Sequence, residues 1–251
     1  MDVVYILGTG SKWNDNEIRY SLRTLEKHFP HDRVFIVGEL PTWLRNVIHL
    51  NVSDQQPATA GNKLRNALRK IRAACEHDEI SDQFVLMNDD FFFLKDVETI
   101  EPYSLGTIQK TIDDHRTKKG YYYDALVRTK KFLQERGIEE PVSYGVHYPF
   151  VYDKHKFLQM TNEIDTVGRE LSLRTIYGNL YQIGSVQRED TKVTSFDDLK
   201  DFIKYSEGDF LSINDSLARY PRFQEWIQYR FPEQSKYEQV KTDRYALSRR
   251  K

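Results

Sequence analysis

Two short apolar runs, far apart in the chain, each end in an amide followed by a carboxylate. Phe84–Met87 leads into Asn88-Asp89-Asp90, and Phe210–Ile213 leads into Asn214-Asp215. Adjacent carboxylates beside apolar segments are costly unless a cation or hydrogen bonds compensate their charge. Their hard oxygen atoms suit Mg²⁺ or Mn²⁺, with water completing an octahedron. We expect Asp90 and Asp215 to share one such cation; solvated Asp residues in strand-end turns are the alternative.

A second group of residues has the chemistry to bind phosphate. Gly8-Thr9-Gly10 follows the apolar run Val3–Leu7, and glycines there let a ligand approach the backbone closely. The third glycine of a dinucleotide-binding fingerprint is missing. Asn62 is the predicted N-cap of a helix, so Lys63 and free backbone N–H groups meet at a helix start. The candidate ligand-binding residues in these segments are Leu7, Gly8, Thr9, Gly10, Asn62, Lys63, Asn88 and Asp89.

Three arginines extend this anion-binding prediction. Arg19 and Arg23 lie one turn apart near the start of a predicted helix that runs to Phe29. Two guanidinium groups at that spacing could clamp a diphosphate, with a solvated surface pair as the alternative. Arg174 is an arginine among apolar neighbours in the predicted helix Leu171–Asn179.

One histidine and one basic segment are further candidates. His147 lies in the aromatic loop Tyr144–Pro149, and the ordinary pKa of histidine suits a general base, although a lone histidine is more often structural. Arg116–Lys131 carries six Lys or Arg residues around three tyrosines. It is a candidate surface for an anionic acceptor, and a solvated helix pair is the favoured alternative.

The elements that must position these residues follow a strand, helix, strand, strand, helix, strand order. This order predicts an α/β fold with a mostly parallel, Rossmann-type sheet flanked by helices. The helical segments between Leu105 and Gly137 form a predicted insertion. We expect one domain over residues 1–251, with a first half (1–100), a helical insertion (101–140), a second half (141–234) and a frayed polar tail (235–251). A helix from the cap Ser195 to Tyr205 and a last helix near Pro221–Phe231 complete the prediction.

Composition excludes several classes of protein. The 37 Lys and Arg residues nearly balance 38 Asp and Glu residues, which argues against general coating of nucleic acid or membranes. The single cysteine excludes an intramolecular disulfide framework. The sequence shows no leader pattern and no apolar run approaching 18 residues, so we expect a soluble, cytoplasmic protein without a membrane span.

Four segments in order resemble the Stealth family, which includes capsular polysaccharide phosphotransferases and the lysosomal-enzyme N-acetylglucosamine-1-phosphotransferase. They are Asp2–Tyr5, Asn16–Lys27 with its continuation through Pro41–Leu44 and Leu86–Phe91, His147–Pro149, and Phe210–Asp215. Asn16–Lys27 is the specific match; the family's opening segment continues differently where Ile6–Gly10 stands here. The resemblance implies a GT-A-like fold and a nucleotide-sugar donor held through a divalent cation. It makes residues 1–100 the nucleotide-sugar-binding half, in which the candidate ligand-binding residues above would contact the nucleotide sugar, and residues 141–234 the acceptor and catalytic half.

The resemblance implies an enzyme that moves a sugar-1-phosphate to a hydroxyl acceptor, with Asp89, His147 and Arg174 as candidate catalytic residues. The acceptor would be a glycan, a polymer such as a capsular polysaccharide, or a modified DNA. An ordinary GT-A glycosyltransferase that moves the sugar itself is the alternative enzyme. A carbohydrate- or nucleic-acid-binding module without catalysis is the alternative of another class, because a fold does not fix a function.

Overall fold

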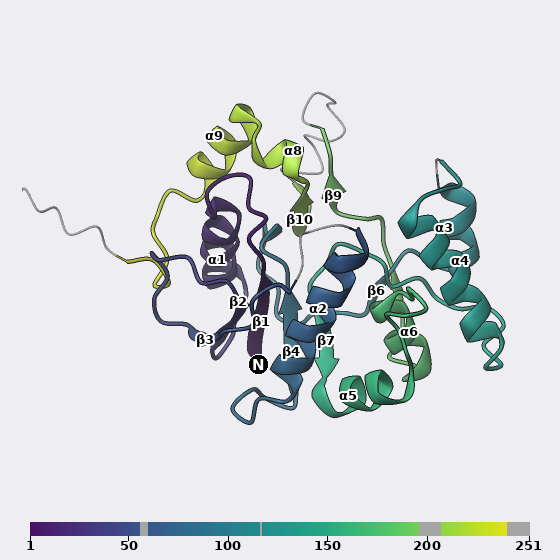
Figure 1. Cartoon of the computed structure of the whole chain (residues 1–251). Helices are drawn as coiled ribbons and strands as arrows, with labels where there is room; N and C mark the ends of the chain where they lie inside the picture. Colours follow the sequence, from purple (N-terminus) through teal and green to yellow (C-terminus); the bar gives the residue numbers. More distant parts are fainter. Residues whose placement is uncertain (56–59, 116, 196–206, 240–251) are drawn as a thin grey trace, which may run out of the picture.

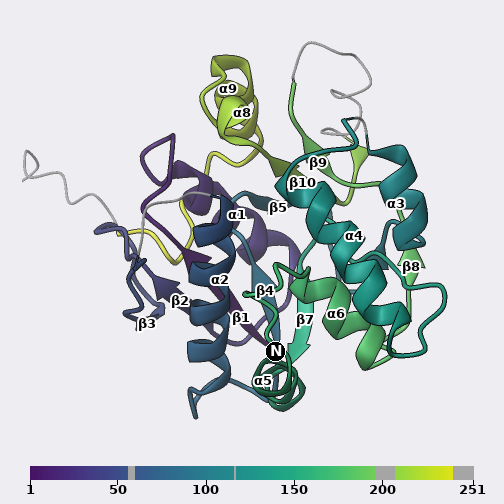
Figure 2. The same cartoon turned by 45° about the vertical axis from the view of Figure 1, so that its right-hand side comes forward.

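A computed structural model describes residues 1–55, 60–115, 117–195 and 207–239. Its central sheet has the strand order β3-β2-β1-β4-β7 (Figures 1 and 2). The first four strands pair in parallel and β7 is antiparallel to β4. Their bounds are β1 Asp2–Leu7, β2 Val34–Gly38, β3 Ile48–Leu50, β4 Gln83–Met87 and β7 Phe150–Asp153. The predicted α/β fold with a mostly parallel sheet is confirmed.

The sheet is buried on both faces because alternate residues of its strands meet different helices. Val3, Tyr5 and Leu7 of β1 pack in one apolar cluster with Ile18, Leu22 and Leu25 of α1 (Asn16–His28). Val4 packs in a second cluster with Ile71 and Cys75 of α2 (Ala60–Cys75). The uninterrupted apolar runs of the sequence thus reflect a sheet covered by helices on both sides.

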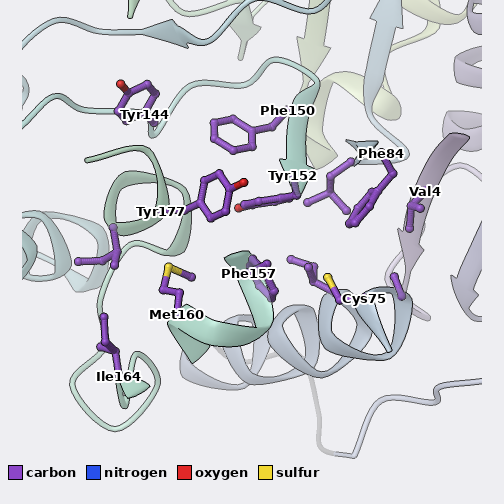
Figure 3. Packing of buried hydrophobic residues seen from close by; sticks show 14 of the residues in the cluster. Val4, Cys75, Phe84, Tyr144, Phe150, Tyr152, Phe157, Met160, Ile164 and Tyr177 are labelled. Carbon is purple, nitrogen blue, oxygen red and sulfur yellow. The ribbon is translucent and has the colours of Figure 1, made fainter. Parts of the chain in front are cut away.

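The second cluster is rich in aromatic rings. Figure 3 shows Tyr152 of β7 between Phe84 of β4 and Tyr177 of α6 (Leu173–Leu180). Phe157 and Met160 reach it from α5 (Lys154–Glu163). Two further helices, α3 (Ile108–Asp114) and α4 (Tyr121–Gln134), lie beside each other at the far edge of the molecule from α1 (Figure 1). The sequence analysis did not predict β7 and α5, whose residues directly follow the aromatic loop.

A small sheet brings the two Asn-Asp segments together. β5 (Phe91–Phe93) is antiparallel to β10 (Phe210–Ile213), and β9 (Lys192–Val193) is parallel to β10. Asp90 immediately precedes β5, so it lies beside the end of β10, which Asn214-Asp215 follows. The helices α8 (Asp215–Ala218) and α9 (Pro221–Arg230) cover this sheet. A further pair, β6 (Tyr103–Ser104) and β8 (Val186–Gln187), is parallel.

Several local predictions need correction. Asn62 lies inside α2, which begins at Ala60, so it is not the N-cap. The predicted helix from Ser195 to Tyr205 falls almost wholly outside the described residues. Ser235–Gln239 is packed rather than frayed: Tyr237 and Glu238 are buried, and Gln239 donates its backbone N–H to the carbonyl of Trp43. Within the described part of the chain, no helix has the length and apolar character needed to cross a membrane.

Glu238 explains why the C-terminal segment is held in place. Its side chain is fully buried and accepts hydrogen bonds from Arg19 (2.7 Å) and Arg23 (2.7 and 2.9 Å) on α1. Burial alone would raise the pKa of Glu238, but the hydrogen bonds from Arg23, Ser235 and Arg19 outweigh it and lower that pKa. The two arginines therefore serve the fold, which corrects their assignment to a diphosphate clamp.

Replacing Glu238 by Gln should lower the free energy of unfolding by about 3 kcal/mol, because two guanidinium groups would lose their buried counter-ion. This value is at the low end for a broken buried pair, since the Arg19 side chain is 23% exposed. Chemical denaturation at neutral pH checks it, with the exposed Glu233→Gln as the matched control. Because the folded-state pKa of Glu238 is lowered, its stabilisation is complete above its ordinary pKa and is lost as the pH falls through the folded value. Equal stability of the two variants would contradict this role.

Candidate active site

A cavity of about 610 Å³ opens at the carboxyl edge of β1 and β4, where ligands bind in open α/β sheets. We call it the carboxylate cavity. Seven of the predicted site residues line it: Gly8, Gly10, Lys63, Asn88, Asp89, Asp90 and Asp215. The structure thus brings both Asn-Asp segments and two of the predicted phosphate-binding segments to one cavity.

Helix α1 positions the Asp89-Asp90 turn through its small polar residues. The Ser21 hydroxyl lies 2.9 Å from the Tyr5 hydroxyl on β1 and donates to the carbonyl of Phe91. The Thr24 hydroxyl accepts the backbone N–H of Phe93 at 3.1 Å. The segment that resembles the Stealth family most specifically therefore fixes the strand that follows the carboxylates.

The loop after β1 is held from both sides. Glu17 accepts from the Ser11 hydroxyl (2.7 Å) and the Lys12 backbone N–H (3.0 Å). Lys70 of α2 donates to the carbonyl of Leu7 (2.5 Å) and to Asp54 (2.6 Å). A Cβ at Gly8 would come within 2.9 Å of Asp54 Oδ2, so a larger residue there would require the Asp54 side chain to shift. Leu7 and Thr9 do not line the cavity themselves, but they lie next to Gly8 and Gly10, which do.

The neighbours of the buried Asp89-Asp90 turn balance only part of the negative charge of its two carboxylates. Burial raises the pKa of Asp89, and the neighbouring charges of Asp90 and Glu17 raise it further. Burial also raises the pKa of Asp90, against the opposing effects of Lys192 and His147. The Oδ1 atom of Asp90 is buried without a hydrogen-bond partner. Asp90 lines the carboxylate cavity together with Asp215, and a carboxylate with an unpartnered oxygen at such a place fits a divalent cation.

Only two carboxylates are proposed to hold this cation. Among the described residues, no group of three or more His, Cys, Asp or Glu side chains has the arrangement of a metal site. Mg²⁺ commonly binds through one or two carboxylates, with waters and substrate phosphates as its other ligands. The side chains present therefore fit a cation that is bound together with a diphosphate.

A second cavity of about 400 Å³, which we call the histidine cavity, adjoins the first: Ile6, Ala67 and Asn88 line both. His147 and Arg174 line the histidine cavity. The Nδ1 atom of His147 lies 2.7 Å from Asp190 Oδ2, and its backbone N–H donates to Asp190 Oδ1 at 2.9 Å. Burial would raise the pKa of Asp190, but the hydrogen bonds and charge of His147 outweigh it and lower that pKa.

Arg174 has a positioning role rather than the predicted place beside the phosphates. Its Nη1 donates to the carbonyls of Val146 (2.9 Å) and Tyr148 (2.8 Å), the residues on either side of His147. Burial lowers its pKa.

Two further residues near these cavities, Asp190 and Lys192, could not be identified from the sequence, because neither lies in a motif.

Three basic side chains of the segment Arg116–Lys131 have partners within the protein. Arg128 pairs with Glu170, Lys130 bonds to Gln109, and Lys118 bonds to a backbone carbonyl. Arg116 lies outside the described residues.

Adding Mn²⁺ or Mg²⁺ should raise the melting temperature of the wild-type protein, and Asp90→Asn or Asp215→Asn should remove most of that increase, because each deletes a charged ligand. The exposed Asp113→Asn is the matched control. Protons compete with the cation for carboxylates of raised pKa, so the affinity should increase with pH until Asp89 and Asp90 are both ionised. Undiminished metal-induced stabilisation in both variants would rule out this site.

No protein-family model matches the chain. Over 122 residues the chain is 32% identical to the N-acetylglucosamine-1-phosphotransferase subunits alpha/beta of Homo sapiens, and 31% identical to those of Mus musculus. Each match covers 41% of this chain and 9% of the length of that relative. The similarity therefore concerns a segment of a much longer protein.

Three solved structures that resemble this one are of LgtC, a galactosyltransferase, and of a xylosyltransferase. An active-site mutant of LgtC aligns over 94% of this chain and 98% of its own, with a TM-score of 0.50 and 10% identity. Galactosyltransferase LgtC with donor and acceptor sugar analogues covers 91% and 96%, with a TM-score of 0.48 and 12% identity. Mouse xyloside xylosyltransferase 1 covers 84% and 97%, with a TM-score of 0.44 and 10% identity. The chain has the GT-A-type fold, and the predicted resemblance to the Stealth phosphotransferases is confirmed over the matched segment.

Proposed function

We propose that this chain is a metal-dependent transferase that moves a sugar-1-phosphate from a nucleotide sugar to a hydroxyl group. One observation carries the proposal: two Asn-Asp segments, 125 positions apart from Asp90 to Asp215, line one cavity that adjoins the His147–Asp190 pair. In this proposal the diphosphate would bind beside a group that can accept a proton.

The phosphate groups of the donor would lie in the carboxylate cavity. A bound Mg²⁺ or Mn²⁺ would neutralise negative charge on the diphosphate there. Lys12 and Lys63 line the same cavity and are both exposed, so their ammonium groups can turn toward the phosphates. Asn88 lines both cavities, which places its amide where the diphosphate and the transferred group would meet.

His147 would accept the proton of the acceptor hydroxyl. The carboxylate of Asp190 accepts from Nδ1–H, which leaves the lone pair on Nε2. The acceptor oxygen then attacks the phosphorus that carries the sugar. The bond from this phosphorus to the oxygen of the nucleoside monophosphate breaks, and the leaving group keeps the electron pair.

The alternative enzyme uses the same donor site but breaks the bond at the anomeric carbon. It is kept because the resembling structures are named as glycosyltransferases. Incubation with nucleotide sugars, Mg²⁺ or Mn²⁺ and hydroxyl acceptors separates the two reactions by their products. Nucleoside monophosphate supports sugar-phosphate transfer, whereas nucleoside diphosphate supports sugar transfer. Binding without either product would support a non-catalytic carbohydrate-binding module.

His147→Ala should lower turnover by about 100- to 10,000-fold while donor affinity changes little, because a general base acts in the chemical step. Turnover, donor affinity and melting temperature measured on this variant separate that role from a structural one. His155→Ala, which alters an exposed histidine paired with Asp82, is the control. A folded His147→Ala protein with near-normal turnover would leave Asp89 as the next candidate base.

Asp190→Asn should lower turnover, because it removes the carboxylate that holds the His147 ring with Nε2 free to accept a proton. The hydrogen bonds and charge of His147 lower the pKa of Asp190, so this carboxylate is ionised near neutral pH in the wild-type protein. Turnover, donor affinity and melting temperature of the variant check this, and the fall in turnover should occur with little change in donor affinity. Normal turnover in a folded Asp190→Asn protein would separate Asp190 from the proposed base.

A further inference from the structure

The segment Asp190-Thr191-Lys192 links the proposed base to the acidic turn. Asp190 bonds to both the ring and the backbone of His147, and the Thr191 hydroxyl donates to the His147 carbonyl at 2.6 Å. The backbone N–H of Lys192 donates to Asp190 Oδ1 at 3.3 Å. The position of Lys192 is therefore fixed relative to His147.

The small sheet fixes Lys192 relative to the carboxylates as well. Lys192 pairs with Ser212 of β10, and Ser212 pairs with Phe91 of β5. The residue before Phe91 is Asp90, so three neighbouring strands deliver Lys192, Asp215 and Asp90 to one end of the sheet. All three residues line the carboxylate cavity.

The two oxygens of Asp90 have different surroundings. Oδ1 has no hydrogen-bond partner, whereas Oδ2 lies 3.9 Å from the ammonium nitrogen of Lys192. That distance is an ion pair but is too long for a hydrogen bond, so the ammonium donors are not committed to Asp90. A divalent cation at Oδ1 and the ammonium group beside Oδ2 would flank one carboxylate.

We propose that Lys192 is a further catalytic residue that contacts the phosphate group undergoing transfer. The reaction in this inference rests on the proposed function. The ligand, a diphosphate, is inferred from the positions of Lys192 and Asp90 in the carboxylate cavity. As the acceptor oxygen bonds to phosphorus and the nucleoside monophosphate leaves with its electron pair, negative charge accumulates on the phosphate oxygens. The ammonium of Lys192 donates a charge-assisted hydrogen bond to these oxygens and stabilises that charge.

Three variants test this role: Lys192→Met removes the charge, Lys192→Arg keeps it, and Lys95→Met removes an exposed charge paired with Asp209. Calorimetry first measures binding of Mn²⁺ alone and of inorganic pyrophosphate in EDTA. Lys192→Met should weaken pyrophosphate binding by roughly 10- to 100-fold, the effect of losing a charge-assisted hydrogen bond. Its affinity for Mn²⁺ should be unchanged or higher, because a positive charge beside Asp90 is gone. Lys192→Arg should keep most of the pyrophosphate affinity, and Lys95→Met all of it.

Weaker binding of pyrophosphate together with unchanged or tighter binding of Mn²⁺ in Lys192→Met would identify Lys192 as a phosphate contact. A purely structural lysine would lower both affinities together with the melting temperature, and that result would overturn the proposal. Absence of pyrophosphate binding in the wild-type protein, in EDTA and again with Mn²⁺ present, would overturn it too. Turnover of nucleotide sugars then tests the reaction separately: Lys192→Met should lower the rate by about 100- to 1,000-fold. If the wild-type protein turns over no nucleotide sugar but the binding pattern holds, the proposed reaction fails and the phosphate contact stands. Normal turnover and normal pyrophosphate affinity in Lys192→Met would leave the reaction intact and remove Lys192 from it.

Discussion

Two adjacent carboxylates at the end of a buried strand set the main electrostatic constraint on this protein. Burial raises the pKa values of Asp89 and Asp90, and the charge of Asp90 raises that of Asp89 further, so their charge is costly until a cation is near. The surrounding structure holds Asp89 and Asp90 in place although their charge is unfavourable there. Ser21 and Thr24 bond to the backbone of the following strand, and β10 pairs with it. An acidic turn held rigidly in this way is prepared for a cation that arrives with its ligand.

The charged residues around this turn fall into two groups: some are paired within the protein, and others face the carboxylate cavity. Arg19 and Arg23 form ion pairs with Glu238, which joins α1 to the C-terminal segment. Lys70 bonds to Asp54 and to the carbonyl of Leu7. These pairs stabilise the walls of the carboxylate cavity, and the cations left to face its interior are Lys12, Lys63 and Lys192 among the described lining residues. A polar cavity lined by these three ammonium groups suits an anionic ligand.

One short segment links the residues proposed for proton transfer and for charge stabilisation. Asp190 orients His147, and Lys192 lies two residues later beside Asp90. Arg174 holds the backbone on both sides of His147. The proposed base and the proposed phosphate site therefore share a framework of backbone hydrogen bonds, and a displacement of β9 would disturb both. This coupling favours a transferase over a module that only binds.

The sequence by itself determined the parallel sheet, because apolar runs and helical periodicity depend on residues a few positions apart. It also identified both Asn-Asp segments and His147 as candidate site residues, since each lies at the end of such a run or in a distinctive loop. The partners of the charged side chains could not be predicted in this way. Arg19 meets Glu238 across 219 positions, and Lys192 lies on a two-residue strand with no periodicity to detect. Tertiary structure decided these roles because charges select partners through space, where burial and distance set the interaction energy rather than separation along the chain.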